Sequence, residues 1–212
     1  MHDLSLYAME LIENSIRAQA ALVAIHIEFD KYADLLKLRV EDDGEGIHTT
    51  AEEVFDPFYT TKGSKKVGLG LSLFKEVVEL SHGRVTMSRS GKLEGMAVEA
   101  VMRLTDVNRP PLGDFATTIS TMILANPTVD FHLNVRSGER QYSFRLKEFA
   151  RNNRLDPGDN IDLAVSAFTA LRAEMEAWKR YDLMCSKEKW QAAMNGPALC
   201  GNDPELNQGV VA

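Results

Sequence analysis

The chain has 212 residues, 44% of them hydrophobic, which is enough for one domain of ordinary size with a buried core and an appendage. Its net charge of −7 argues against a surface that binds nucleic acid or an anionic membrane. No stretch approaches the roughly 18 consecutive apolar residues of a membrane span, and the two cysteines have neither metal nor redox spacing. We therefore expect a reduced, cytoplasmic protein.

A first helix is predicted from Asp3, a plausible N-cap, with an apolar stripe at helical spacing: Leu4, Ala8, Leu11, Ile12 and Ser15. Glu10 and Asn14 lie four residues apart on the opposite side and are neighbours there. An asparagine amide oxygen can bind Mg²⁺, which usually takes few protein ligands when it carries a nucleotide. A carboxylate one turn away could orient or deprotonate a water molecule. The alternative is an ordinary solvated helix face.

Two strands follow, and the second ends in an acidic, glycine-containing segment. Apolar residues alternate over 23–29 and again over 35–41. Period two places Asp42 on the inward face, where a carboxylate is costly unless a hydrogen-bond donor meets it. Gly44 and Gly46 let the backbone approach a flat ligand closely. The pattern suits a purine with an exocyclic amine, and the alternative is an acidic hairpin turn.

A cationic stretch over residues 55–66 leads into a helix expected at about 70–81. Backbone N–H groups at a glycine-bearing helix start bind anions, and lysine side chains would add charge for a triphosphate. The residues concerned are Lys62, Lys65, Lys66, Gly68 and Gly70. Taken by itself, such a glycine pair is also compatible with a plain loop.

A hairpin over 84–90 and 95–104 completes this part of the chain, after His82 and Gly83 close the helix as a cation and a glycine cap. We expect a mixed sheet covered on one side by helices, which is a two-layer α/β sandwich.

Paired prolines within residues 108–114 predict a boundary, after which the pattern restarts. We expect a small α+β appendage over 112–182 that packs on the first domain, and a disordered tail over 195–212. The predicted elements of the appendage are a helix at 115–125, strands at 129–135 and 141–146, and a helix at 159–181. The apolar stripe of the last helix suits either a core or a homodimer interface.

The order of these segments resembles the GHKL superfamily of ATPases, whose members include DNA gyrase, the heat-shock 90 chaperones, histidine-kinase catalytic domains and MutL-type mismatch-repair ATPases. The motifs are Glu10-Leu-Ile-Glu-Asn14, Asp42-Asp-Gly-Glu-Gly46, Phe55-Asp-Pro-Phe-Tyr-Thr-Thr-Lys62 and Val67-Gly-Leu-Gly-Leu-Ser72. The resemblance covers about residues 4–104 and implies a Bergerat-type ATP-binding domain over 1–105. With the segment Arg109-Pro-Pro-Leu-Gly-Asp114, the chain looks like a stand-alone histidine-kinase-like ATP-binding protein.

The resemblance implies roles for the matching residues. Asn14 would coordinate Mg²⁺ and the phosphates of ATP, and Asp42 would accept a hydrogen bond from the adenine amine in a slot shaped by Gly44 and Gly46. Glu10 aligns with the general base of the hydrolytic members. The phosphates would meet a flexible lid and the start of the following helix, formed by Lys62, Lys66, Gly68, Gly70 and Leu71.

Two positions depart from the pattern of the family. Lys66 stands where members related to the sensor kinases commonly have another glycine, so the geometry of the lid can differ. Met96 follows Gly95 where a threonine often lies near the adenine, and a methionine side chain cannot provide the same hydrogen bond.

Three functions are compatible with these residues: phosphoryl transfer to a protein partner in trans, slow ATP hydrolysis that drives a conformational clamp, and an ATP-gated binding module like the anti-sigma kinases. The five histidines lie at positions 2, 26, 48, 82 and 132, and none occupies the paired-helix context of a phosphoacceptor, His2 at the very start being the nearest case. We therefore expect no autophosphorylation in cis.

Overall fold

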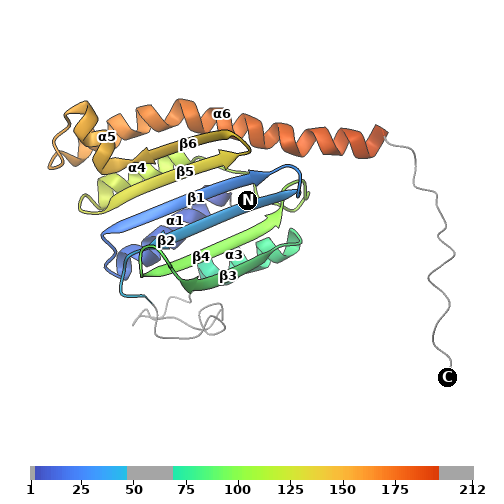
Figure 1. The fold of residues 1–212 in the computed structure, drawn as a ribbon, viewed down its shortest axis with the longest axis horizontal. Coiled ribbons are helices and arrows are strands. Elements are labelled where there is room, and N and C mark those ends of the chain that lie inside the picture. Colours follow the sequence, from blue (N-terminus) through green and yellow to red (C-terminus); the bar gives the residue numbers. More distant parts are fainter. Residues whose placement is uncertain (1–2, 47–68, 196–212) are drawn as a thin grey trace, which may run out of the picture.

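The structure is a computed structural model, and it describes residues 3–46 and 69–195. Along the chain, pairs of consecutive strands follow single helices, and two helices end the described part; Figure 1 labels them. They are α1 (Leu4–Arg17), β1 (Leu22–Asp30), β2 (Leu35–Asp42), α3 (Leu69–Leu80), β3 (Arg84–Arg89), β4 (Met96–Arg103), α4 (Phe115–Ala125), β5 (Asp130–Ser137), β6 (Arg140–Arg145), α5 (Leu146–Asn153) and α6 (Asn160–Asn195).

The six strands form one mixed sheet in the order β3-β4-β2-β1-β5-β6. Strand β1 runs parallel to β5, and the other neighbouring pairs are antiparallel. Helices α1, α3 and α4 lie behind the sheet in Figure 1, and no helix of the described residues covers its front, which we call the open face. The molecule is therefore the two-layer α/β sandwich predicted from the sequence.

Alternating side chains of the strands build the core between the sheet and the helices. In β1 the inward residues Val23, Ile25, Ile27 and Phe29 are all at most 1% exposed. The same apolar cluster continues into β5 and into α6, whose Trp178 stacks on Phe29 with 5.8 Å between ring centroids. The helix–hairpin–helix segment thus shares the sheet and the core of the preceding part, while the domain boundary near residue 105 stays a prediction.

The predicted elements agree closely with the observed ones, with a few differences. Helix α4 has the expected bounds, α5 was not expected, and α6 continues to Asn195 rather than ending near residue 181. The predicted glycine cap of α3 is also wrong in one detail. His82 rather than Gly83 takes the left-handed conformation, with φ of 53°, and Gly83 donates its N–H to the carbonyl of Val78. The expected disordered tail falls outside the described residues apart from Asn195.

The segment between β4 and α4 ties three parts of the molecule together. Arg109 forms a buried ion pair with Asp182 of α6, with 2.7 Å between Nη2 and Oδ1. Pro111 and Leu112 accept hydrogen bonds through their carbonyls from the N–H groups of Leu4 and Ser5, at 3.0 and 3.1 Å. These contacts supply partners for the otherwise unpaired donors at the start of α1.

Candidate functional site

Asp42 ends β2 on its inward face, as period two predicts, and it is 4% exposed. Three donors of the protein meet its carboxylate. Ser15 Oγ donates to Oδ2 at 2.5 Å, and the N–H groups of Gly44 and Met96 donate to Oδ1 at 3.0 and 3.1 Å. A carboxylate has about four acceptor sites, so with these partners from the described residues one site remains on Oδ2 for a further donor.

Two of these donors were not recognised from the sequence. Ser15 was assigned to the apolar stripe of α1, yet its hydroxyl, buried with the rest of the residue, points at Asp42. The signal was its polarity within an otherwise apolar helical face. At Met96 the side chain was considered, whereas the backbone N–H makes the contact. Asp42 therefore has a hydrogen-bond donor from β4, the Met96 N–H, although this chain has methionine where family members often have threonine.

Glycine is required close to this carboxylate for reasons of space. A Cβ atom on Gly95 would overlap the carbonyl oxygen of Asp42 and lie 2.5 Å from its Oδ1. At Gly44 it would lie 2.6 Å from the carbonyl oxygen of Ala18, at the end of α1. Gly46 has a φ of 76° and faces the side chain of Met96. Gly44 therefore packs closely against Ala18, the C-cap of α1, and the adenine slot at Gly44 and Gly46 stays a prediction.

Glu10 and Gly70 are brought together by the packing of α1 on α3. Tyr7 and Phe74 contact each other between the two helices, with ring centroids 5.0 Å apart. One turn further along, the carboxylate of Glu10 lies against the first turn of α3, since a Cβ atom on Gly70 would overlap Glu10 Oε2. Burial raises the pKa of Tyr7, and the negative charges of Glu10 and Glu76 add to that effect. The proposed general base therefore lies at the helix start predicted to bind phosphate.

Asn14 lies on the next turn of α1 and is partly buried. Its side-chain amide makes no hydrogen bond within the part of the chain that the structure describes, so its oxygen can serve as a ligand. The described residues contain no group of three or more histidine, cysteine or acidic side chains that could hold a metal ion. The predicted role of Asn14 as a ligand of Mg²⁺, which usually takes only one or two ligands from the protein when it carries a nucleotide, stays a prediction.

The rest of the predicted phosphate site is only partly described. Lys62, Lys66 and Gly68 lie outside the described residues. Leu71 is partly buried and packs against the apolar core, which gives it a structural role as well as the proposed one. Of the predicted site residues, the structure therefore places two groups: one around Asp42 at the end of β2 and one formed by Glu10, Asn14 and Gly70.

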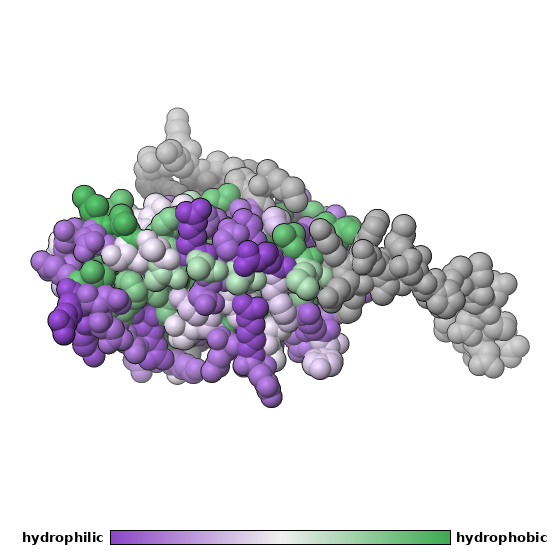
Figure 2. Space-filling model, turned by 90° about the horizontal axis from the view of Figure 1, so that it is seen from above, coloured by the Kyte–Doolittle hydropathy of each residue, from purple (hydrophilic) through white to green (hydrophobic). Residues whose placement is uncertain are grey.

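The exposed side of α6 is a separate feature. A hollow of about 330 Å³ is lined by side chains of this helix alone: Phe168, Thr169, Arg172, Ala173 and Glu176. In Figure 2, which views the molecule from the side of α6, hydrophobic residues form small groups among hydrophilic ones. Of the stripe predicted for a core or an interface, Leu171, Met175 and Trp178 are buried, whereas Ile161 and Val165 are 69% and 58% exposed. No helix of the described residues is both long and apolar enough to cross a membrane.

Comparison with known families agrees with this geometry. Residues 2–106 match the model of the family described as histidine kinase-, DNA gyrase B-, and HSP90-like ATPases, and this part of the chain belongs to that family. This part of the chain is therefore a GHKL ATPase domain.

Among curated proteins, the chain is similar to two sensor proteins of Pseudomonas aeruginosa. It is 38% identical to the alginate biosynthesis sensor protein KinB over 80 residues, which are 36% of this chain and 13% of that protein. It is 32% identical to the sensor protein kinase PmrB over 117 residues, which are 51% of this chain and 24% of that one. The chain thus spans a quarter or less of the length of these relatives.

Among solved structures, the chain is similar to the Aquifex aeolicus MutL ATPase domain complexed with ADP. The TM-score is 0.40 at 18% identity, and the match covers 78% of this chain and 70% of the other.

Proposed function

We propose that the protein binds ATP with Mg²⁺ and transfers the γ-phosphoryl group, either to water in slow hydrolysis or to a partner protein in trans. The observation that supports this most directly is the contact of Glu10 with Gly70. It brings a carboxylate to the start of the helix that the family resemblance assigns to the phosphates. A helix start binds anions through its unpaired N–H groups and dipole, so a phosphate bound there would lie next to the Glu10 carboxylate.

The residues around the two groups would divide the work as follows. Asp42 would accept a hydrogen bond from the adenine amine at its remaining acceptor site. Asn14 would hold Mg²⁺, which when bound neutralises charge on the phosphates. Glu10 would take the proton of the attacking water or acceptor hydroxyl, and the lid lysines Lys62 and Lys66 would add positive charge. Phosphoryl transfer needs positioning and charge neutralisation more than covalent help.

The test of Glu10 is a pair of substitutions on α1. Glu10→Ala should lower the rate of phosphate release by at least about 100-fold, because a general base contributes roughly that much or more. Binding of ATP should stay within a few-fold of wild type. The matched control is Glu13→Ala, which removes an exposed carboxylate of the same helix that pairs with Arg17 at 3.6 Å. An unchanged rate in Glu10→Ala would overturn the assignment of the base.

A second measurement separates transfer from hydrolysis. The protein is incubated with ATP labelled at the γ-phosphate, alone and together with proteins encoded next to it. Label on a protein supports a kinase, and free labelled phosphate supports an ATPase. Binding without either product would favour the remaining candidate, a regulatory module whose partner affinity is set by the nucleotide.

The relatives named above are sensor proteins, so we propose a role in signal transduction in the cytoplasm with a protein partner. A homodimer through α6 is part of the same proposal, because Ile161 and Val165 are exposed there. Sedimentation of the wild type and of Ile161→Glu would test the dimer, since the charge should shift the protein to a monomer.

A further inference from the structure

The turn between β3 and β4 is held at both of its ends by consecutive carboxylates of β2. Ser90, at the start of the turn, donates its hydroxyl to Glu41 Oε2 at 3.0 Å. Met96, just past its end, donates its N–H to Asp42 Oδ1 at 3.1 Å. Since adjacent side chains of a strand point to opposite faces, the turn bridges the open face and the candidate site.

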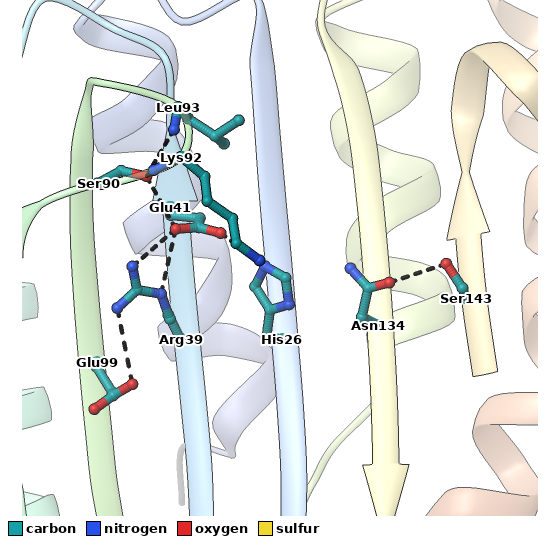
Figure 3. Close-up of polar contacts among 9 residues, drawn as sticks. All are labelled: His26, Arg39, Glu41, Ser90, Lys92, Leu93, Glu99, Asn134 and Ser143. Carbon is teal, nitrogen blue, oxygen red and sulfur yellow. Dashed lines mark hydrogen bonds and ion pairs between the residues drawn. The ribbon is translucent and has the colours of Figure 1, made fainter. Parts of the chain in front are cut away.

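Glu41 is firmly fixed although it belongs to the open face. It is 5% exposed, and Figure 3 shows its carboxylate among Arg39, His26 and the turn residue Ser90. Arg39 Nη2 and Nε lie 2.8 and 3.3 Å from Oε2, and His26 Nε2 lies 3.1 Å from Oε1. Burial alone would raise the pKa of Glu41, but the hydrogen bonds and charges of these neighbours lower it below its ordinary value. The hydroxyl of Ser90 is thus bound to a buried carboxylate that Arg39 and His26 also contact.

Ser90 passes this constraint on to the rest of the turn. Its Oγ accepts hydrogen bonds from the N–H groups of Leu93 and Lys92 at 3.0 and 3.4 Å. Its backbone N–H donates to the carbonyl of Gly95 at 2.9 Å, and its carbonyl accepts from Glu94 at 3.1 Å. The position of Ser90 therefore fixes the position of Gly95.

Gly95 in turn packs closely against Asp42. There is no room for a Cβ atom between Gly95 and the Asp42 carboxylate, and the Met96 N–H bonds Oδ1 from the next residue. A shift of the turn by a few tenths of an ångström would change how Asp42 Oδ1 is held and thereby where Oδ2 points.

We propose that Ser90 and Glu41 are positioning residues for recognition of the adenine base, acting from the opposite face of the sheet through the turn at 90–95. This inference rests on the proposed function, because it takes Asp42 as the acceptor of the adenine amine. Neither residue touches the nucleotide. They would change the preference for a purine with an exocyclic amine, as in ADP, over one with a carbonyl at the same position, as in GDP. They would not change binding of the phosphates.

The experiment compares Ser90→Ala and Glu41→Gln with a control on the same face. The control is Glu28→Gln, because Glu28 is a carboxylate paired with Arg136 and Lys37 at 2.7 and 3.6 Å and has no contact with the turn. Two readouts are taken on each folded protein: hydrogen exchange of the Met96 amide without nucleotide, and the dissociation constants of ADP and GDP by calorimetry.

We expect faster exchange at Met96 in Ser90→Ala and Glu41→Gln, and an ADP preference over GDP reduced about tenfold, which is the size of one ordinary hydrogen bond. Glu28→Gln should match wild type in both readouts. Ser90→Thr keeps the hydroxyl and should therefore keep the wild-type preference for ADP. A general effect of changing the side chain at this position would lower the preference in this variant as well.

Other outcomes overturn the inference in distinguishable ways. If the Met96 amide exchanges as in wild type in both variants, the mechanical link is absent. If exchange rises but ADP and GDP weaken equally, the residues support the fold and not base recognition. If wild type binds no nucleotide at all, the proposed function fails, while the exchange data still report on the link. Should Ser90→Ala fail to fold, Glu41→Gln is compared with Glu28→Gln by the same two readouts.

Discussion

Glu41 and Asp42 are neighbours at the end of β2 with nearly the same burial, 5% and 4% exposed, yet they have different surroundings. On the open face, the carboxylate of Glu41 has four polar contacts: two with guanidinium nitrogens, one with an imidazole nitrogen and one with a hydroxyl. On the helix-covered face, Asp42 meets three neutral donors from a hydroxyl and two backbone N–H groups.

The difference shows that burial alone does not identify a functional carboxylate. Glu41 has a cation beside it, and three of its four polar contacts crowd onto Oε2, so its charge is already paired within the protein. Among the described residues, Asp42 retains one acceptor site, and its three hydrogen-bond donors are all uncharged. A buried acid with a spare acceptor site is able to select a ligand that donates a hydrogen bond, such as an amine.

A third buried carboxylate extends the comparison and gives the largest expected effect. Asp182 is paired with Arg109, and burial raises its pKa although the arginine opposes that shift. Asp182→Ala should lower the free energy of unfolding by about 3–5 kcal/mol, because it leaves a buried guanidinium without its counter-ion. Urea denaturation measures this.

The control for that experiment is Glu176→Ala, which removes an exposed partner of Lys179 at 3.8 Å and should cost less than about 1 kcal/mol. If Asp182→Ala lowers the free energy of unfolding no more than the control does, pairing with a cation is not what identifies a structural carboxylate in this protein.

The next largest effect is expected at Asp42. In Asp42→Asn the amide oxygen takes the place of Oδ1 and still accepts hydrogen bonds. The NH₂ group takes the place of Oδ2, and because it is itself a donor it cannot accept from the adenine amine. ATP affinity should fall by roughly 10-fold to 150-fold, the worth of about 1.5–3 kcal/mol for a charge-assisted hydrogen bond. Calorimetry measures the affinity, and circular dichroism checks that the fold is intact. Binding as tight as in wild type would show that Asp42 does not recognise the base.

The smallest effect concerns the pH dependence of the open face. Burial lowers the pKa of His26 below its ordinary 6.5, helped by the charges of Arg39 and Lys92 and opposed by Glu41. Below pH 6.5 the unfolded chain therefore takes up this proton more readily than the folded protein, so stability falls as the pH is lowered through that window. The lowered pKa of Glu41 acts in the same direction only below its ordinary 4.5.

Denaturation curves between pH 6.5 and 4.5 test this contribution. The loss of stability should be shallower in His26→Asn than in wild type. An identical slope in both proteins would mean that His26 titrates in the folded protein as it does in the unfolded chain.

Most of the fold follows from local patterns in the sequence. Alternation in β1 and β2 predicted which side of each strand is buried, and Asp3 was correctly expected as the N-cap of α1, with its carboxylate accepting from the Leu6 N–H. The helix at α4 was predicted to the residue. These features depend on periodicity and capping within one segment, which the sequence carries directly.

What the sequence did not supply depends on contacts between distant segments. The parallel pairing of β1 with β5 places residues such as Ile25 and Leu133 opposite each other, and no local pattern specifies that neighbour. Likewise Ser15 was read as part of an apolar stripe, because its role depends on a carboxylate 27 residues away. Left-handed His82 was missed because the adjacent glycine is the statistically preferred residue there.

The hydrogen bonds from Leu4 and Ser5 to Pro111 and Leu112 have a consequence for anyone who wishes to shorten the protein. A fragment that stops at residue 105 would expose two backbone donors at the entrance of the helix that presents Glu10 and Asn14, and would strip the neighbouring strand from β1. We expect such a fragment to lose the helix start before it loses the rest of the sheet, so a useful minimal version should extend at least through β5.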